Sequence, residues 1–365
     1  MLPIPSYRLE QLAKMGLPEQ VFIPALLQEL HHEIPSRINT FCWQNSEGKL
    51  DNIYDESLNT TVITHFISAM SSNGTDMYTK TTEWVSTLNK ITTSYEFYRK
   101  CPYVADFYKK ILRPMGYQNS CFVPIIDQDA NKRHGILMLH RRRSDGDFIE
   151  NERQYLSHVA KIIVMASKQF VNPEVFTMDG WEQGMLVLDS KGKLQKGCTM
   201  GLKLLAMASS SKFNQSTTKT PNDLSIFNGL KELIQSISSD SYRHLHQCAD
   251  PTLTVANAWG EFRLRAFLTE DVNDSKTMEI GLTISWQEPF ILKLFHRIKR
   301  LNLTPRQESV GLFYANGDHL QVIAEKLGIS LHTIKEHIKN ITLRLNIKTR
   351  SDLVALILCD KIFID

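Results

Sequence analysis

The stretch from Leu303 to Leu358 decides the fold of the C-terminal region: LTPRQESVGLFYANGDHLQVIAEKLGISLHTIKEHIKNITLRLNIKTRSDLVALIL. It opens with a helix start, because Thr304 is a suitable N-cap, Pro305 needs no N–H at the first helical position, and Gln307 can reach back to the cap. Asn316–Gly317 is a favourable pair for the end of that helix. The pattern therefore predicts one short helix between these two signals.

Three more short helices follow in the same stretch. The second spans about 319–326, and Gly328 supplies the tight turn after it. Ser330 is placed to cap the third helix, and the fourth begins near Ser351. Two helices joined by a short glycine-containing turn form the helix-turn-helix pattern. The residues expected to be buried in the second and fourth helices are Val322, Ile323, Ala324, Leu327, Leu353, Val354, Leu356 and Ile357.

The third helix has two distinct faces. Its apolar residues recur at helical spacing and form one stripe toward a core, namely Ile334, Ile338, Ile341 and Leu345. The side chains that this rotation turns away from the core are Thr333, Lys335, Glu336 and Lys339. Charged faces on small helices are usually only solvated. A basic, polar N-terminal half also suits the major groove of DNA, where a lysine can reach guanine O6 and N7 or a phosphate.

These residues resemble the LuxR-type DNA-binding domain, a four-helix module with a helix-turn-helix core. The resemblance covers the whole stretch without a gap and rests on Leu303–Arg306, Ile323–Ala324, Leu327–Ser330, Thr333–His337, Asn340–Ile341, Leu345, Arg350 and the closing LVALIL. It implies that Lys335, Glu336 and Lys339 face bases or backbone in the groove, and that Thr333 and Arg350 hold phosphates. Ser330 and Arg306 complete the expected DNA-binding set.

Two departures from the family pattern concern charge. Gln307 and Ser309 stand where acidic residues are common, although Gln307 still completes the capping box. Glu336 places a negative charge on the groove-facing side of the helix. It can accept a hydrogen bond from a cytosine N4 amine, or exclude wrong sites by repulsion.

The composition is that of an ordinary globular protein with a local basic region. The 365 residues allow two or three domains, and the formal net charge is only +3. Between Lys293 and Arg350, however, eleven Lys and Arg residues stand against four Asp and Glu residues. A local excess of this kind is the electrostatic footprint of a DNA-binding protein.

Cysteine usage and hydropathy indicate a cytoplasmic protein. The six cysteines show no C-x-x-C pairing, which argues against a zinc site or a disulfide framework. The N-terminus lacks the pattern of a signal peptide, and no apolar stretch approaches the length of a membrane helix. We therefore expect no membrane association.

Residues 1–172 are predicted to form a first unit. A helix around Val21–His32 and a strand-like run at Arg37–Trp43 are followed by a helical middle rich in aromatic residues. Strands at Cys121–Asp127 and Gly135–Arg141 then precede an amphipathic helix over Phe148–Gln169. This order resembles a GAF-like sensor domain. The aromatic residues expected to belong to the core rather than to a ligand box are Trp43, Trp84, Tyr95 and Tyr98.

Residues 173–289 are predicted to form a second unit. A hairpin begins at Gly184–Asp189, and a short helix and a polar loop over 209–221 follow it. A helix over Leu224–Ile237 precedes three strands, TLTVAN, EFRLRAFLT and MEIGLTISW. This architecture resembles a PAS-like domain. Residues 290–301 are expected to be a linker helix, and 302–365 the DNA-binding domain. No internal sequence repeat is visible.

Other classes of function find little support. The histidine pairs His31–His32, His134 with His140, and His244 with His246 lack carboxylate or cysteine partners at a metal-binding spacing. No nucleophile elbow, P-loop or dinucleotide-binding motif is present, so we expect neither an enzyme nor a cofactor. The acidic residues and lysine of a phosphorylated receiver domain are absent. The spacing of Trp43, Tyr54, Asp55 and Trp84 also departs from the acyl-homoserine-lactone branch of the LuxR-type family.

The sequence thus predicts an α+β multidomain bacterial transcriptional regulator, with GAF-like and PAS-like α/β sensor domains ahead of an all-α LuxR-type module. The expected partners are double-stranded DNA, a second copy in a homodimer, an unidentified small-molecule ligand and RNA polymerase. The alternative is a protein-interaction scaffold that has no ligand and brings a partner to DNA. The ligand-binding residues stay open.

Overall fold

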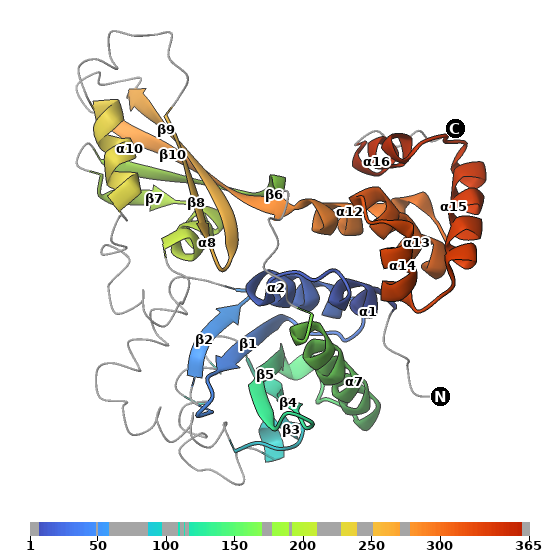
Figure 1. The fold of residues 1–365 in the computed structure, drawn as a ribbon. Helices are drawn as coiled ribbons and strands as arrows, with labels where there is room; N and C mark the ends of the chain where they lie inside the picture. The colour runs from blue at the N-terminus through green and yellow to red at the C-terminus, as the bar shows by residue number, and fades with distance from the viewer. Residues whose placement is uncertain are drawn as a thin grey trace.

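The computed structural model describes residues 7–48, 50–57, 87–96, 109, 113, 117–169, 177–189, 192–209, 228–238, 251–270 and 278–359. Two antiparallel sheets and a C-terminal helical bundle make up these parts of the chain (Figure 1). The mixed α/β architecture with a helical C-terminus agrees with the prediction. Among the described residues, no helix has the length and apolar character required to cross a bilayer.

The first sheet has the strand order β2-β1-β5-β4-β3. Its strands are β1 (Ile38–Gln44), β2 (Leu50–Asp55), β3 (Thr92–Thr93), β4 (Asn119–Asp127) and β5 (Lys132–Arg141). Three helices adjoin it, namely α1 (Tyr7–Ala13), α2 (Glu19–Leu30) and α7 (Glu150–Ser167). The predicted helix at 21–32, the strands at 37–43, 121–127 and 135–141, and the helix at 148–169 are all present.

Strand alternation gives the first sheet two different faces. Phe41 pairs with both Tyr54 and Leu137, so these side chains share one face, and all three are buried in the core. Thr40 pairs with Asp55, and Ser120 with His140, on the opposite face. One face of the sheet is therefore apolar, and the other buries polar groups.

The second sheet has the strand order β7-β6-β10-β9-β8. Its strands are β6 (Thr177–Asp189), β7 (Leu194–Gly197), β8 (Thr252–Asn257), β9 (Gly260–Glu270) and β10 (Met278–Pro289), with helices α8 (Thr199–Ser209) and α10 (Asn228–Ser238). Counted within each sheet, both orders read 2-1-5-4-3. The two sheets therefore share a topology that no sequence repeat announces.

Helix α8 lies directly on β6 because two glycines meet there. A Cβ atom built on Gly184 would come within 2.2 Å of the Gly201 backbone, so neither position has room for a side chain. On the same side of the sheet, Leu186, Leu264 and Leu282 are fully buried. This packing gives the second sheet an apolar core of its own.

The C-terminal bundle consists of helices α12 (Phe290–Ile298), α13 (Pro305–Asn316), α14 (Leu320–Leu327), α15 (Leu331–Leu345) and α16 (Arg350–Leu358), with a 3-10 turn at Lys299–Leu301. Thr304 and Gln307 form the predicted capping box, with nitrogen-to-oxygen distances of 3.1 and 3.3 Å. Helix α12 follows β10 without a loop and packs against α13 and α16.

Several predicted details are wrong, or lie outside the described residues. Val322 is 38% exposed rather than buried, because it lies on the outer side of α14, and Tyr95 is 64% exposed rather than in the core. Val354 and Leu356 are only half-buried, whereas Trp43 is buried as predicted. The predictions for Trp84, Tyr98, His244, His246, 210–221 and 224–227 fall outside the described residues.

Candidate functional site

Helix α15 is positioned by the turn before it. Gly328 adopts a left-handed conformation with φ of 63°, which favours glycine and ends α14. The Ser330 Oγ atom accepts a hydrogen bond from the Thr333 backbone N–H at 3.1 Å, as an N-cap does. These two local signals fix where α15 begins and how it leaves the turn.

The packing of α15 confirms the predicted two faces. Ile334 and Ile341 are buried, and Ile338 and Leu345 are half-buried, so the apolar stripe points into the bundle. The charged residues of the other face, Lys335, Glu336 and Lys339, are all exposed. The helix therefore presents a mixed-charge surface with two lysines and one carboxylate.

The other four predicted site residues differ in their surroundings. Thr333 is half-buried, and its Oγ1 atom lies 2.8 Å from the Ser330 Oγ atom, so these two hydroxyls meet at the start of α15. Arg350 is exposed at the start of α16, and its guanidinium group lies beside Gly317. Arg306 is half-buried on α13 and donates to the Leu327 carbonyl at 2.9 Å, which ties α13 to the end of α14.

Comparison with protein families gives one match. Residues 301–357 match the family described as bacterial regulatory proteins, luxR family. The C-terminal bundle contains a LuxR-type DNA-binding domain. DNA is therefore a partner of this part of the chain.

Comparison of the whole chain adds little. No curated protein gives a significant match. Among solved structures, the chain is similar to the Vibrio cholerae VqmA dimer, which is described in the context of target DNA and LuxR-type receptors. The identity is 14%, the TM-score is 0.19, and the match covers 49% of this chain and 83% of that one. A TM-score this low carries no structural argument.

Not all basic residues near the LuxR-type domain are available to DNA. The Lys326 Nζ atom pairs with Asp318 at 2.6 Å, and Arg344 donates to the Asn302 carbonyl at 2.6 Å. Arg297 donates to the Leu358 carbonyl at 2.6 Å. Together with Arg306, these cations link elements of the bundle to one another, although Arg344 remains exposed. The exposed cations that the domain presents include Lys335, Lys339, Lys348 and Arg350.

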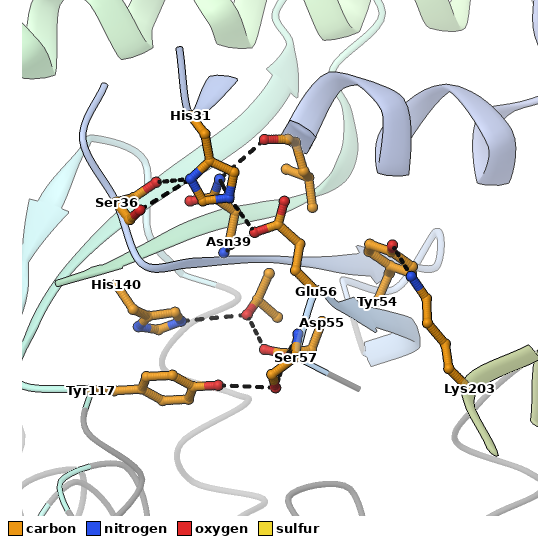
Figure 2. A network of polar contacts seen from close by, with 12 residues as sticks. His31, Ser36, Asn39, Tyr54, Asp55, Glu56, Ser57, Tyr117, His140 and Lys203 are labelled. Atoms are coloured by element: carbon orange, nitrogen blue, oxygen red, sulfur yellow. Dashed lines mark hydrogen bonds and ion pairs between the residues drawn. The ribbon is translucent and has the colours of Figure 1, made fainter. Parts of the chain in front are cut away.

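A second polar site, which the sequence did not reveal, lies on the polar face of the first sheet (Figure 2). The Thr40 Oγ1 atom donates to Asp55 Oδ2 at 2.5 Å, and the Ser57 backbone N–H donates to Asp55 Oδ1 at 2.9 Å. The Ser57 hydroxyl also donates to that carboxylate and lies 3.3 Å from the Tyr117 hydroxyl. Asp55 is therefore held by Thr40 on β1 and by Ser57 just after β2, and Ser57 in turn lies next to Tyr117.

His140 connects this site to the neighbouring strand. Its Nδ1 atom lies 2.8 Å from the Ser120 hydroxyl, and its Nε2 atom lies 3.4 Å from the Thr40 hydroxyl. The Tyr117 ring stacks on the imidazole, with ring centroids 4.5 Å apart. Burial lowers the pKa of His140 to about 4, so the ring is neutral at pH 7.

Asp55 is the acidic group of this network. Burial raises the pKa of Asp55, although the hydrogen bonds from Ser57 and Thr40 act in the opposite direction. Each residue of the network described above has a hydrogen-bond partner within it. Among the described residues, no group of three His, Cys, Asp or Glu side chains could hold a metal ion.

Buried charges also join the parts of the chain. Between the two sheets, the Lys203 Nζ atom on α8 lies 3.2 Å from the Tyr54 hydroxyl and 3.5 Å from Glu182 Oε1, and all three residues are buried. Beside them the Trp43 and Trp259 rings meet edge to face, with centroids 5.7 Å apart. The first and second sheets therefore share a packed boundary.

The LuxR-type domain is attached to the first unit by a cluster around Arg8 on α1. Arg8 pairs with Glu29 on α2 at 2.8 Å and with Glu308 on α13 at 2.6 Å. Sequence reasoning missed this cluster because Arg8 and Glu308 are 300 positions apart. The sequence offered one signal of such a contact. Glu308 is a charged residue at a position on the inner side of a predicted helix, where a buried side chain is expected.

Proposed function

We propose that the protein is a sequence-specific transcriptional regulator that binds double-stranded DNA through α15. The observation that carries this proposal is the exposed face of α15, with Lys335, Glu336 and Lys339, in a segment that matches the LuxR family. Lysines at these positions suit guanine edges and phosphates, and the exposure of Arg350 at the start of α16 supports a phosphate contact. A regulator with this task acts in the cytoplasm of a bacterium.

In this proposal, the N-terminal units are sensor domains that transmit a signal to the LuxR-type DNA-binding domain. The shared 2-1-5-4-3 strand order supports two modules of one class, as GAF-like and PAS-like sensors would be. The contacts of Lys203 and Arg8 support the coupling, because they link both sheets and the bundle through buried charges. The signal itself would be a small molecule bound by the N-terminal units.

The protein would bind as a symmetric homodimer to a pseudo-palindromic operator. For helix-turn-helix dimers, the two half-sites lie about one helical turn apart. Exposed cations that neutralise phosphates release counterions from the DNA, so the affinity should fall steeply as the salt concentration rises. Whether the bound dimer recruits RNA polymerase would then depend on the position of the operator in the promoter.

The test begins with selection of a binding sequence from random double-stranded oligonucleotides by the full-length protein. On the selected DNA, Lys339→Ala should relax the base preference at one position, because a lysine that reads a base discriminates between sequences. Arg350→Ala should weaken all sequences alike and reduce the salt dependence. If no sequence is enriched, or if both variants bind like wild type, the proposal is wrong.

A further inference from the structure

Arg8 lies where three parts of the molecule meet. Besides its ion pairs with Glu29 and Glu308, its Nη2 atom donates to the Phe295 carbonyl of α12 at 3.2 Å. The guanidinium group also stacks over the Phe295 ring, 3.9 Å from the centroid. The neighbouring Tyr7 hydroxyl donates to Glu308 Oε2 at 2.6 Å. One side chain of α1 therefore contacts α2, α12 and α13.

The cluster is buried, which determines what it can contribute. The side chains of Arg8, Glu29 and Glu308 are 12%, 9% and 5% exposed. For buried ion pairs, the loss of hydration roughly cancels the attraction, so the intact pair adds little net stability. Removal of one partner is nevertheless costly, because it leaves a buried charge unpaired. The main effect of such a cluster is therefore to favour one relative arrangement of its helices. Its net contribution to the stability of the fold is small.

Among the described residues, contacts hold the bundle to the rest of the chain at the β10–α12 connection, where His296 pairs with Glu288 at 2.8 Å, and at the Arg8 cluster. The first is covalent, since β10 ends at Pro289 and α12 starts at Phe290. Helix α12 packs on α13 and α16 and so belongs to the bundle, and it also contacts β10 and β6. Arg8 contacts both α12 and α13 from the opposite end of the chain. Contacts at both of these places fix the orientation of the bundle relative to the N-terminal units.

We propose that Arg8 is a positioning residue for DNA recognition, which fixes the angle of α15 relative to the N-terminal units. In a homodimer, this angle decides how far apart the two α15 helices lie. Arg8 therefore determines which half-site separation the dimer accepts. The inference rests on the proposed function, because it needs a dimer that reads two half-sites.

A purely structural role makes a different prediction. If the cluster only stabilises the docked domains, its loss lowers the melting temperature and reduces binding to every DNA by the same factor. If it positions α15, its loss changes the ratio of affinities between DNAs that differ only in half-site separation. The readout is therefore this ratio and not the affinity itself.

The experiment uses the full-length protein and a selected operator with two half-sites. The spacer between the half-sites is lengthened and shortened in single base-pair steps, and a single half-site serves as the reference. Affinities are measured for wild type, Arg8→Met, Arg8→Lys and Glu308→Gln. Arg8→Met keeps an unbranched side chain but removes the guanidinium group, Arg8→Lys keeps the charge, and Glu308→Gln keeps hydrogen-bonding atoms while it removes one charge. Arg153→Met is the matched control, because Arg153 pairs with Glu96 and Glu150, both in the first unit.

We expect wild type and Arg153→Met to prefer one spacing. Arg8→Met and Glu308→Gln should reduce the discrimination between the best and worst spacings by at least about fivefold, which is the lower end of typical coupling between sites. Arg8→Lys should retain part of it. Affinity for the single half-site should stay within about twofold for all variants, since α15 itself is unchanged.

Three outcomes would overturn the inference. The cluster has no positioning role if the variants melt earlier but keep the wild-type spacing profile, or if wild type accepts all spacings equally. The same conclusion holds if Arg153→Met flattens the profile as much as Arg8→Met. Should Arg8→Met fail to fold, Glu308→Gln decides the question. Failure of wild type to bind any single half-site would instead refute the proposed function, and the two failures are thereby distinguishable.

Discussion

Helix α15 and the polar face of the first sheet both carry polar side chains on regular elements, yet their environments are opposite. On α15, Lys335 and Lys339 are exposed to solvent. On the sheet, Thr40, Asp55 and His140 are buried and bonded to one another. Exposed charges can be replaced with little effect on stability, whereas buried polar groups cannot. The comparison separates exposed residues, which we propose bind DNA, from buried residues whose loss would destabilise the fold.

The largest effect is expected on the exposed side of this comparison. The double variant Lys335→Ala, Lys339→Ala should lose at least about a hundredfold in affinity for the selected operator, because each good base contact is worth about 1–3 kcal/mol. Its melting temperature should remain that of wild type. Binding is measured by fluorescence anisotropy on labelled DNA. Lys161→Ala on the exposed side of α7 is the control, and an equal loss there would show that only general charge matters.

On the buried side, His140 predicts a dependence of stability on pH. Burial lowers the pKa of its imidazole to about 4, against an ordinary value of about 6.5. The neutral ring contributes stability that is fully present above the unfolded pKa and is lost as the pH falls from about 6.5 toward 4. At pH 5 the contribution of His140 to this loss of unfolding free energy should be about 2 kcal/mol.

This dependence can be measured by urea unfolding at pH 7 and pH 5. His140→Gln should be less stable at pH 7 but should show a smaller change between the two pH values. Asp55 acts in the opposite sense, because its raised pKa favours the folded state as the pH falls. His158→Gln on α7 is the control and should keep the wild-type difference. An unchanged difference in His140→Gln would remove His140 as the cause.

A smaller effect is expected from Thr40→Val. The change removes the hydroxyl that donates to Asp55 Oδ2 and leaves a buried carboxylate one donor short. The cost should be about 1–3 kcal/mol of unfolding free energy. Thr254→Val, at an exposed position of β8, should change stability by no more than about 0.5 kcal/mol. Equal effects at both threonines would mean that the network does not stabilise the sheet.

The smallest effect is expected where a polar side chain is exposed but still bonded to the backbone. The Thr349 hydroxyl caps α16 by accepting from the Asp352 N–H at 3.1 Å. Thr349→Ala should cost about 1 kcal/mol, and Thr349→Ser should retain most of the cap. Thermal unfolding of the two variants measures the difference. A stable Thr349→Ala variant would show that α16 is held by packing alone.

How much of the fold was predictable depended on how local its signals are. The caps at Thr304 and Ser330 are formed as predicted, because a cap needs only residues within one turn. The strand β2 was missed, because its sequence LDNIYD contains acidic and amide residues that are uncommon in strands. Helix α1 was missed as well, since its seven residues are too few for a clear helical period.

Within the predicted DNA-binding site, the sequence alone determined which residues lie on the outer face of α15. Helical spacing fixes that face, so the exposure of Lys335 and Lys339 followed from the position of the isoleucine stripe. Sequence spacing cannot tell a free cation from a bonded one. Arg306 and Lys326 were counted with the basic residues, yet both are engaged in contacts within the bundle.

Tertiary structure alone decided the remainder. Asp55 and His140 lie 85 positions apart and meet only because β1 pairs with both β2 and β5. Arg8 and Glu308 come from opposite ends of the chain and meet only when α1 packs against the bundle. Local signals act over a few bonds of the backbone, whereas these contacts depend on how whole elements pack. The sequence therefore determined the exposed face of α15, and the fold decided what holds that helix in place.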